Sequence, residues 1–106
     1  MRTSYDKLVR DRIPDIIRAS GRSCAVVAMD EEAYRRALRE KLVEEAQEAA
    51  QATPEHLVTE LADLSEVVDA LLAAYGVKRE AVQAEQQRRR AERGGFTRRL
   101  RLLWTD

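Results

Sequence analysis

The sequence predicts an all-α protein in which long helices pack as an antiparallel bundle. Its 106 residues are 36% charged and only 5% aromatic, a balance typical of helical proteins rich in Ala, Leu, Glu and Arg. Apolar residues recur at helical spacing through residues 31–52 and again through residues 54–75. The connection between these two helices, at Thr53 and Pro54, is too short for anything but an antiparallel pair.

The first part of the chain predicts a helical turn followed by a short helix. The turn covers residues 6–10, and the helix has Pro14 in its first turn, where a missing N–H does no harm. Lys7, Arg10 and Arg12 then form a cluster of positive charge that either contacts a ligand or is ordinary solvated surface. The apolar residues that we expect to pack inward here are Leu8, Val9, Ile13, Ile16 and Ile17.

Each end of the chain also carries a run of residues that resembles a strand. Residues 23–29 are apolar and partly β-branched, and residues 96–104 place apolar side chains at alternate positions after the break at Gly94 and Gly95. A strand needs a partner, so we expect a small two-stranded sheet that joins the two ends. Leu103 interrupts the alternation.

The two long helices have clear start signals. Asp30 can accept hydrogen bonds from the free N–H groups of the first turn, where Glu31 and Glu32 add favourable negative charge. Thr53 followed by Pro54 provides a second cap with proline at the first helical position.

A third long helix is predicted over residues 78–93, and it is polar almost all round. We expect it to cover a neighbouring helix with Val82 and a few alanines. Arg88, Arg89 and Arg90 are consecutive, so they cannot share one face of this helix. Some of these arginines must therefore be solvated surface charges.

The two long helices each carry a pair of carboxylates three residues apart. Glu45 and Glu48 form the first pair, and Glu60 and Asp63 form the second. Residues three apart are neighbours on one helix surface, separated by about 60° around the axis. Glu45 and Glu60 fall inside the apolar stripes of their helices, and the other two fall at the stripe edges. Because the helices are antiparallel neighbours, the two acidic faces should meet.

A divalent cation would account for these acids. A carboxylate directed into a core costs several kcal/mol unless it is paired, neutralised or bound to a cation. Oxygen ligands favour Mg²⁺, with Mn²⁺ as the alternative, and His56 is the only histidine or cysteine near the four acids. The alternative interpretation is that the acids are solvated faces that pair with nearby lysine and arginine.

Charge and hydropathy indicate the kind of ligand and the cellular location to expect. Net charge is zero, but acidic side chains concentrate in the middle of the chain and basic ones at both ends, which suits an anionic, metal-bound ligand. No apolar run is long enough to span a membrane, no secretory signal is recognisable, and the single cysteine, Cys24, cannot form an internal disulfide. We therefore expect a single cytoplasmic domain over residues 1–106.

These motifs resemble a known family. Glu44-Glu45-x-x-Glu48 followed by Glu60-x-x-Asp63 is similar to the EExxE and ExxD signature of the all-α nucleoside triphosphate pyrophosphatases, the MazG-like and phosphoribosyl-ATP pyrophosphohydrolase-like group. The N-terminal YDKLVRDRIPDII and the C-terminal RGGFTRRLRLLW resemble one small single-domain subfamily, whose members are expected to remove non-standard nucleotides.

The resemblance implies hydrolysis of a nucleoside triphosphate between the α and β phosphates, which gives a monophosphate and pyrophosphate. The four acids would bind Mg²⁺, and Glu44 would orient or deprotonate the attacking water as general base, unless it is only a surface acid. The candidate phosphate contacts are Lys7, Arg10, Lys41 and Arg93. The resemblance also implies a homodimer, in which helices from both subunits complete the bundle.

Two other classes of protein remain as alternatives. A helical nucleic-acid-binding or antitoxin-like module would use the basic C-terminal segment, but the acidic middle of the chain would repel nucleic acid. A scaffold bundle would keep the fold without the reaction. The sequence leaves the base of the substrate open among damaged nucleotides, dUTP, canonical triphosphates and phosphoribosyl adducts.

Overall fold

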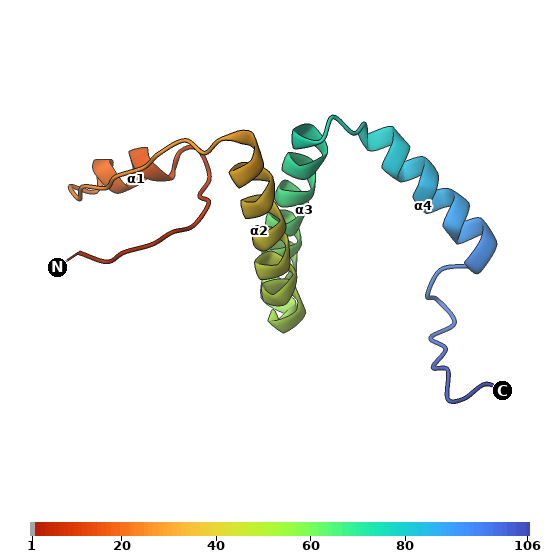
Figure 1. Ribbon diagram of the computed structural model, residues 1–106. Helices are drawn as coiled ribbons and strands as arrows, with labels where there is room; N and C mark the ends of the chain where they lie inside the picture. Colours follow the sequence, from red (N-terminus) through yellow and green to blue (C-terminus); the bar gives the residue numbers. More distant parts are fainter. Residues whose placement is uncertain (1) are drawn as a thin grey trace.

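The computed structural model describes residues 2–106, and its regular structure is helical, as predicted. A central pair of helices, α2 and α3, lies between α1 with the N-terminal segment on one side and α4 with the C-terminal segment on the other (Figure 1). In chain order the elements are α1 (Ile13–Ala19), α2 (Glu31–Gln51), the 3₁₀ turn η1 (Pro54–His56), α3 (Leu57–Ala74) and α4 (Arg79–Arg93).

The predicted two-stranded sheet is wrong, because residues 2–106 contain no strand. The two candidate runs lie on opposite sides of the central pair, so neither offers the other a hydrogen-bonding edge (Figure 1). The C-terminal run is also broken by a turn, in which the Arg99 N–H donates to the Phe96 carbonyl at 3.0 Å. Arg99 has φ 57°, a left-handed conformation that is incompatible with a strand.

The predicted helical turn over residues 6–10 is also wrong. This stretch has no helix, and α1 begins only at Ile13. α1 is seven residues long and buries none of them; Val9 and Ile16 remain 43% and 59% exposed, against the prediction that they pack inward. Among residues 2–106 no other helix packs extensively against α1, so its apolar side chains stay at least partly exposed.

The central pair forms as predicted. The Asp30 side chain accepts a hydrogen bond from the Ala33 N–H at 2.8 Å, which caps α2. α2 ends at Gln51, and only Ala52 and Thr53 precede η1, so α3 returns antiparallel against α2. The Thr53 side chain makes no capping bond, in contrast to its predicted role. Leu38 of α2, 2% exposed, is the most deeply buried residue between the two helices.

Arginines of α2 connect the first turns of that helix to the end of α3. Arg35 donates to the Ala74 carbonyl through Nε and Nη2, at 3.2 and 2.8 Å. Its guanidinium also stacks 4.6 Å from the centre of the Tyr75 ring, and the Arg39 Nε donates to the Tyr75 hydroxyl at 3.0 Å. These bonds satisfy a free carbonyl at the end of α3 and fix the helix ends together.

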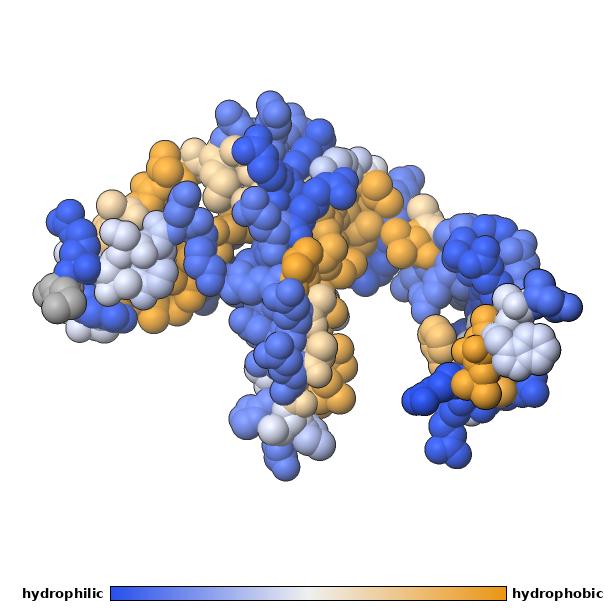
Figure 2. All heavy atoms as spheres, turned by 60° about the horizontal axis from the view of Figure 1, so that its bottom comes forward, coloured by the Kyte–Doolittle hydropathy of each residue, from blue (hydrophilic) through white to orange (hydrophobic). Residues whose placement is uncertain are grey.

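The central pair covers only a small part of the chain's apolar surface. The radius of gyration is 18.5 Å, against about 13 Å for a compact domain of roughly 100 residues. Figure 2 shows hydrophobic side chains along the central pair, on the side toward α4, and again on the C-terminal segment. α4 buries no residue, so the predicted covering role of Val82, which is 43% exposed, is wrong within one chain.

Within the part of the chain that the structure describes, no helix is both long and apolar enough to cross a membrane.

Candidate active site

Three of the four predicted metal ligands meet between α2 and α3. Glu45 comes from α2, and Glu60 and Asp63 come from α3. One carboxylate oxygen of each residue lies within 4.8 Å of an oxygen of the other two. The antiparallel arrangement brings the two acidic faces together, as the helical spacing predicts.

Two oxygens of this group, Oε2 of Glu45 and Oε2 of Glu60, are buried without a hydrogen-bond partner among residues 2–106. The Glu45 side chain is only 10% exposed, and Glu60 is half-buried. A buried polar atom without a partner costs about 1 to 3 kcal/mol, and more when the group is charged. A hard divalent cation would satisfy both oxygens at once, so the donor set fits Mg²⁺ or Mn²⁺.

The electrostatics of Glu45 also favour a positive ligand. Burial raises the pKa of the Glu45 carboxyl above 4.5, and the negative charges of Glu48 and Asp63 raise it further. The Lys41 ammonium, 3.7 Å from Glu45 Oε1, acts in the opposite direction without reversing the shift. Lys41 alone therefore does not offset the burial and the negative charges that act on Glu45.

Glu48, the fourth predicted ligand, is exposed and lies outside the group of three. It follows Glu45 by three residues along α2, close enough for its charge to raise the pKa of Glu45. The structure thus places Glu48 at the rim of the site.

Glu44, the predicted general base, is held by two ammonium groups. The Lys7 Nζ donates to Glu44 Oε1 at 2.9 Å, and the Lys41 Nζ lies 3.5 Å from Oε2. The hydrogen bond from Lys7 lowers the pKa of the Glu44 carboxyl below 4.5. A carboxylate with a lowered pKa is a weaker base, so these contacts disfavour proton transfer to Glu44 while they are made.

Arg10 also contacts the acidic group. Its Nη2 donates to Asp63 Oδ1 at 2.8 Å, from a segment that is 53 residues earlier in the chain. Three predicted phosphate contacts, Lys7, Arg10 and Lys41, therefore lie beside the carboxylates, each paired with at least one of them.

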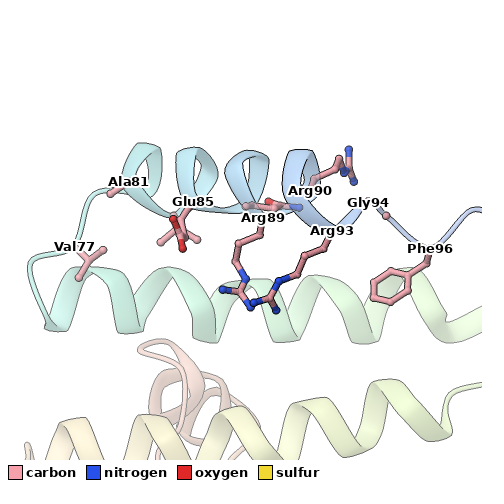
Figure 3. A pocket seen from close by; sticks show the side chains of 11 residues that line it. Val77, Ala81, Glu85, Arg89, Arg90, Arg93, Gly94 and Phe96 are labelled. Atoms are coloured by element: carbon pink, nitrogen blue, oxygen red, sulfur yellow. The ribbon is translucent and has the colours of Figure 1, made fainter. Parts of the chain in front are cut away.

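Arg93, the fourth predicted phosphate contact, lies elsewhere. It lines a groove of about 750 Å³ along α4, and none of the five acids of the two motifs lines that groove. Figure 3 shows Arg89 and Arg93 extending from the same side of α4, as residues four apart should. Arg88 is held on its own helix by Glu85 and Glu92, at 2.6 and 2.7 Å. One chain therefore does not bring the α4 arginines to the acidic site.

A comparison with known protein families identifies the family of this chain. The family model of phosphoribosyl-ATP pyrophosphohydrolase matches residues 22–90, which is more than half of the chain and contains α2, α3 and most of α4. The chain belongs to this family. The resemblance drawn from the EExxE and ExxD motifs is thereby confirmed. Neither the curated proteins nor the solved structures contain a match.

The family is one of pyrophosphohydrolases, hydrolases that act on acid anhydrides, and it is all-α and MazG-like in type. The matched residues include all five acids of the two motifs, so the carboxylates that meet between α2 and α3 lie inside the family's region. Lys7, Arg10 and Arg93 lie outside it.

The sequence did not indicate which basic side chain meets which acid. Lys7 and Arg10 stand out only as a charge cluster, and their partners Glu44 and Asp63 are 37 and 53 residues away. Arg35 and Arg39 were not singled out either. The one available signal for them was their spacing of four on the same helix as the acidic motif.

Proposed function

We propose that this protein is a Mg²⁺-dependent nucleoside triphosphate pyrophosphohydrolase that cleaves between the α and β phosphates. The observation that carries the proposal is the meeting of Glu45, Glu60 and Asp63, with two buried oxygens that lack partners among residues 2–106. Removal of non-canonical nucleotides is the role favoured by the resemblance of YDKLVRDRIPDII and RGGFTRRLRLLW to the small single-domain subfamily.

Glu45, Glu60 and Asp63 would hold the cation, and Glu48 would complete its ligands from the rim of the site. The bound ion would polarise the α-phosphoryl group and neutralise the departing pyrophosphate. Mn²⁺ takes the same kind of oxygen ligands and is the expected substitute.

Glu44 would orient the attacking water and accept its proton. The water oxygen bonds to the α-phosphorus, and the bond from that phosphorus to the α–β bridging oxygen breaks. Pyrophosphate leaves with the electron pair, and the nucleoside monophosphate remains. Lys7, Arg10 and Lys41 lie beside the carboxylates, in position to donate to the phosphate oxygens, and Arg93 would do so from a second subunit.

A homodimer is part of this proposal. Large apolar side chains on α3 remain open to solvent, with Val58 80%, Leu61 45% and Val68 37% exposed. On the C-terminal segment, Phe96 is 96% and Trp104 is 78% exposed. Apolar surface of this extent favours association, and a second copy would cover it while bringing basic segments to the acidic centre.

Pyrophosphate release from a panel of nucleoside triphosphates with Mg²⁺ tests the reaction. The panel should contain canonical, deaminated and oxidised bases, dUTP and a phosphoribosyl adduct of ATP. Glu45→Gln and Glu60→Gln should each reduce turnover by about 100-fold or more, because each removes a charged ligand. Glu40→Gln makes the same change at an exposed position of α2 and should leave turnover unaltered.

A nucleic-acid-binding module is the rival function. Retention of DNA that weakens with salt, without turnover of any nucleotide, would favour it. Hydrolysis that survives both Glu45→Gln and Glu60→Gln would remove the metal-site assignment.

A further inference from the structure

The N-terminal segment crosses both helices that carry the acidic site. Lys7 donates to Glu44 on α2 at 2.9 Å, and Arg10 donates to Asp63 on α3 at 2.8 Å. One extended stretch, residues 5–10, therefore connects the two helices at the carboxylates. We call this stretch the N-terminal strap.

Each basic side chain of the strap is bound to a group that the proposed reaction needs. Asp63 belongs to the group of three carboxylates, and one of its oxygens accepts the guanidinium of Arg10. One oxygen of Glu44 accepts a hydrogen bond from the Lys7 ammonium at 2.9 Å. While the strap is bound, Arg10 occupies an oxygen of Asp63 that a cation would need, and Lys7 occupies an oxygen of Glu44 that a water molecule would need.

These contacts are exchangeable. The side chains of Arg10 and Asp63 are 58% and 39% exposed, and those of Lys7 and Glu44 are 52% and 32% exposed. Ion pairs of this exposure are weak, whereas a divalent ion gathers several carboxylates at once. Once released, the guanidinium would stand next to any polyphosphate at the site, and its planar donors suit two phosphate oxygens.

We propose that the strap is a relay of positive charge: Arg10 and Lys7 neutralise Asp63 and Glu44 before a divalent cation binds, and they transfer to the phosphates of the substrate afterwards. This inference rests on the proposed function for its second half. The strap lies outside residues 22–90, so the family relationship does not assign it.

Two binding measurements on the full chain test the relay, and neither uses turnover. Free Mn²⁺ is followed by electron paramagnetic resonance in the absence of nucleotide, where Arg10→Gln should tighten Mn²⁺ binding about two- to five-fold. Inorganic tripolyphosphate is then titrated at saturating Mn²⁺, where the same variant should bind about ten-fold more weakly or worse. Opposite changes in one variant are the signature of the relay.

Arg12→Gln is the matched control, because Arg12 is an exposed arginine just beyond the strap, at the N-cap of α1, and no ion pair among residues 2–106 includes it. It removes the same charge and should change neither affinity by more than about two-fold. Lys7→Gln is a second test variant that should behave like Arg10→Gln, and circular dichroism melts confirm that all variants fold.

The outcomes separate the relay from the proposed function. If wild-type protein binds Mn²⁺ and Arg10→Gln matches Arg12→Gln in both titrations, the relay is wrong and the metal site stands. If Arg10→Gln binds both Mn²⁺ and tripolyphosphate more weakly than wild type does, the strap supports the site instead of competing with the cation. That result also overturns the relay. If wild-type protein binds no Mn²⁺, the metal site and the relay fail together.

Discussion

Glu45 on α2 and Glu60 on α3 approach each other across the central helix pair, and each carries one buried oxygen that finds no hydrogen-bond partner within residues 2–106. Asp63 completes the group from the next turn of α3. Three carboxylates at this separation repel one another, and the ion pairs with Arg10 and Lys41 leave the two buried oxygens without partners among the described residues, so a cation would stabilise the arrangement.

The stability of the cation-free protein should depend on pH through Glu45. Its pKa in the folded chain is raised above 4.5, chiefly by burial. Because the pKa of Glu45 is higher in the folded than in the unfolded chain, this carboxyl stabilises the fold when the pH is below its unfolded-state pKa. The contribution is lost as the pH rises through its folded-state pKa. In a chelator, Glu45→Gln should therefore be more stable than wild type at pH 7, and the difference should shrink toward pH 4.

Urea unfolding across this pH range measures the difference. The pKa of Glu44 is shifted in the opposite direction, but Glu44 is present in both proteins, so its effect on the difference in stability largely cancels. Glu40→Gln should show no pH-dependent difference from wild type. A constant gap between Glu45→Gln and wild type at all pH values would contradict the burial of this carboxyl.

The cap of α2 should contribute measurably to stability. Asp30→Ala removes the bond from the side chain to the Ala33 N–H and should cost about 1 kcal/mol in the free energy of unfolding. Thr53→Ala is the comparison, because Thr53 makes no capping bond, and it should cost clearly less. Equal losses would mean that Asp30 does not cap the helix in solution.

The dimer should depend on the exposed apolar side chains of α3. Val58→Glu places a charge on this surface and should shift the protein toward a monomer of 12.1 kDa in analytical ultracentrifugation. Thr59→Glu adds the same charge at the next exposed position and should leave the association intact. A wild-type protein that is monomeric at micromolar concentration would contradict the proposed dimer.

The sequence predicts the central pair well because its signals are local. Asp30 and the Thr53-Pro54 step act within one turn of their helices, so the predicted boundaries lie within a few residues of those observed. The spacing of three within each acid pair also fixes which face each carboxylate occupies, and the short connection brings the faces together. Glu45 and Glu60 could therefore be placed from the sequence.

The sequence fails where the result depends on distant partners. Val26 and Val27 have strand-like neighbours, yet they are 58% and 86% exposed because the other run lies across the molecule. A β-branched run indicates a strand only if a second edge is within reach. The pairing of Arg10 with Asp63 is equally inaccessible to sequence patterns, since no local rule links residues 53 apart.

Calorimetric titration of the full-length, chelator-treated protein with Mg²⁺ tests the central claim most directly. The account predicts that wild type and Glu40→Gln bind the ion, and that Glu45→Gln binds it about 100-fold more weakly or not at all. Equal binding by Glu45→Gln, or no binding by wild type, would contradict the assignment of Glu45, Glu60 and Asp63 as a cation site.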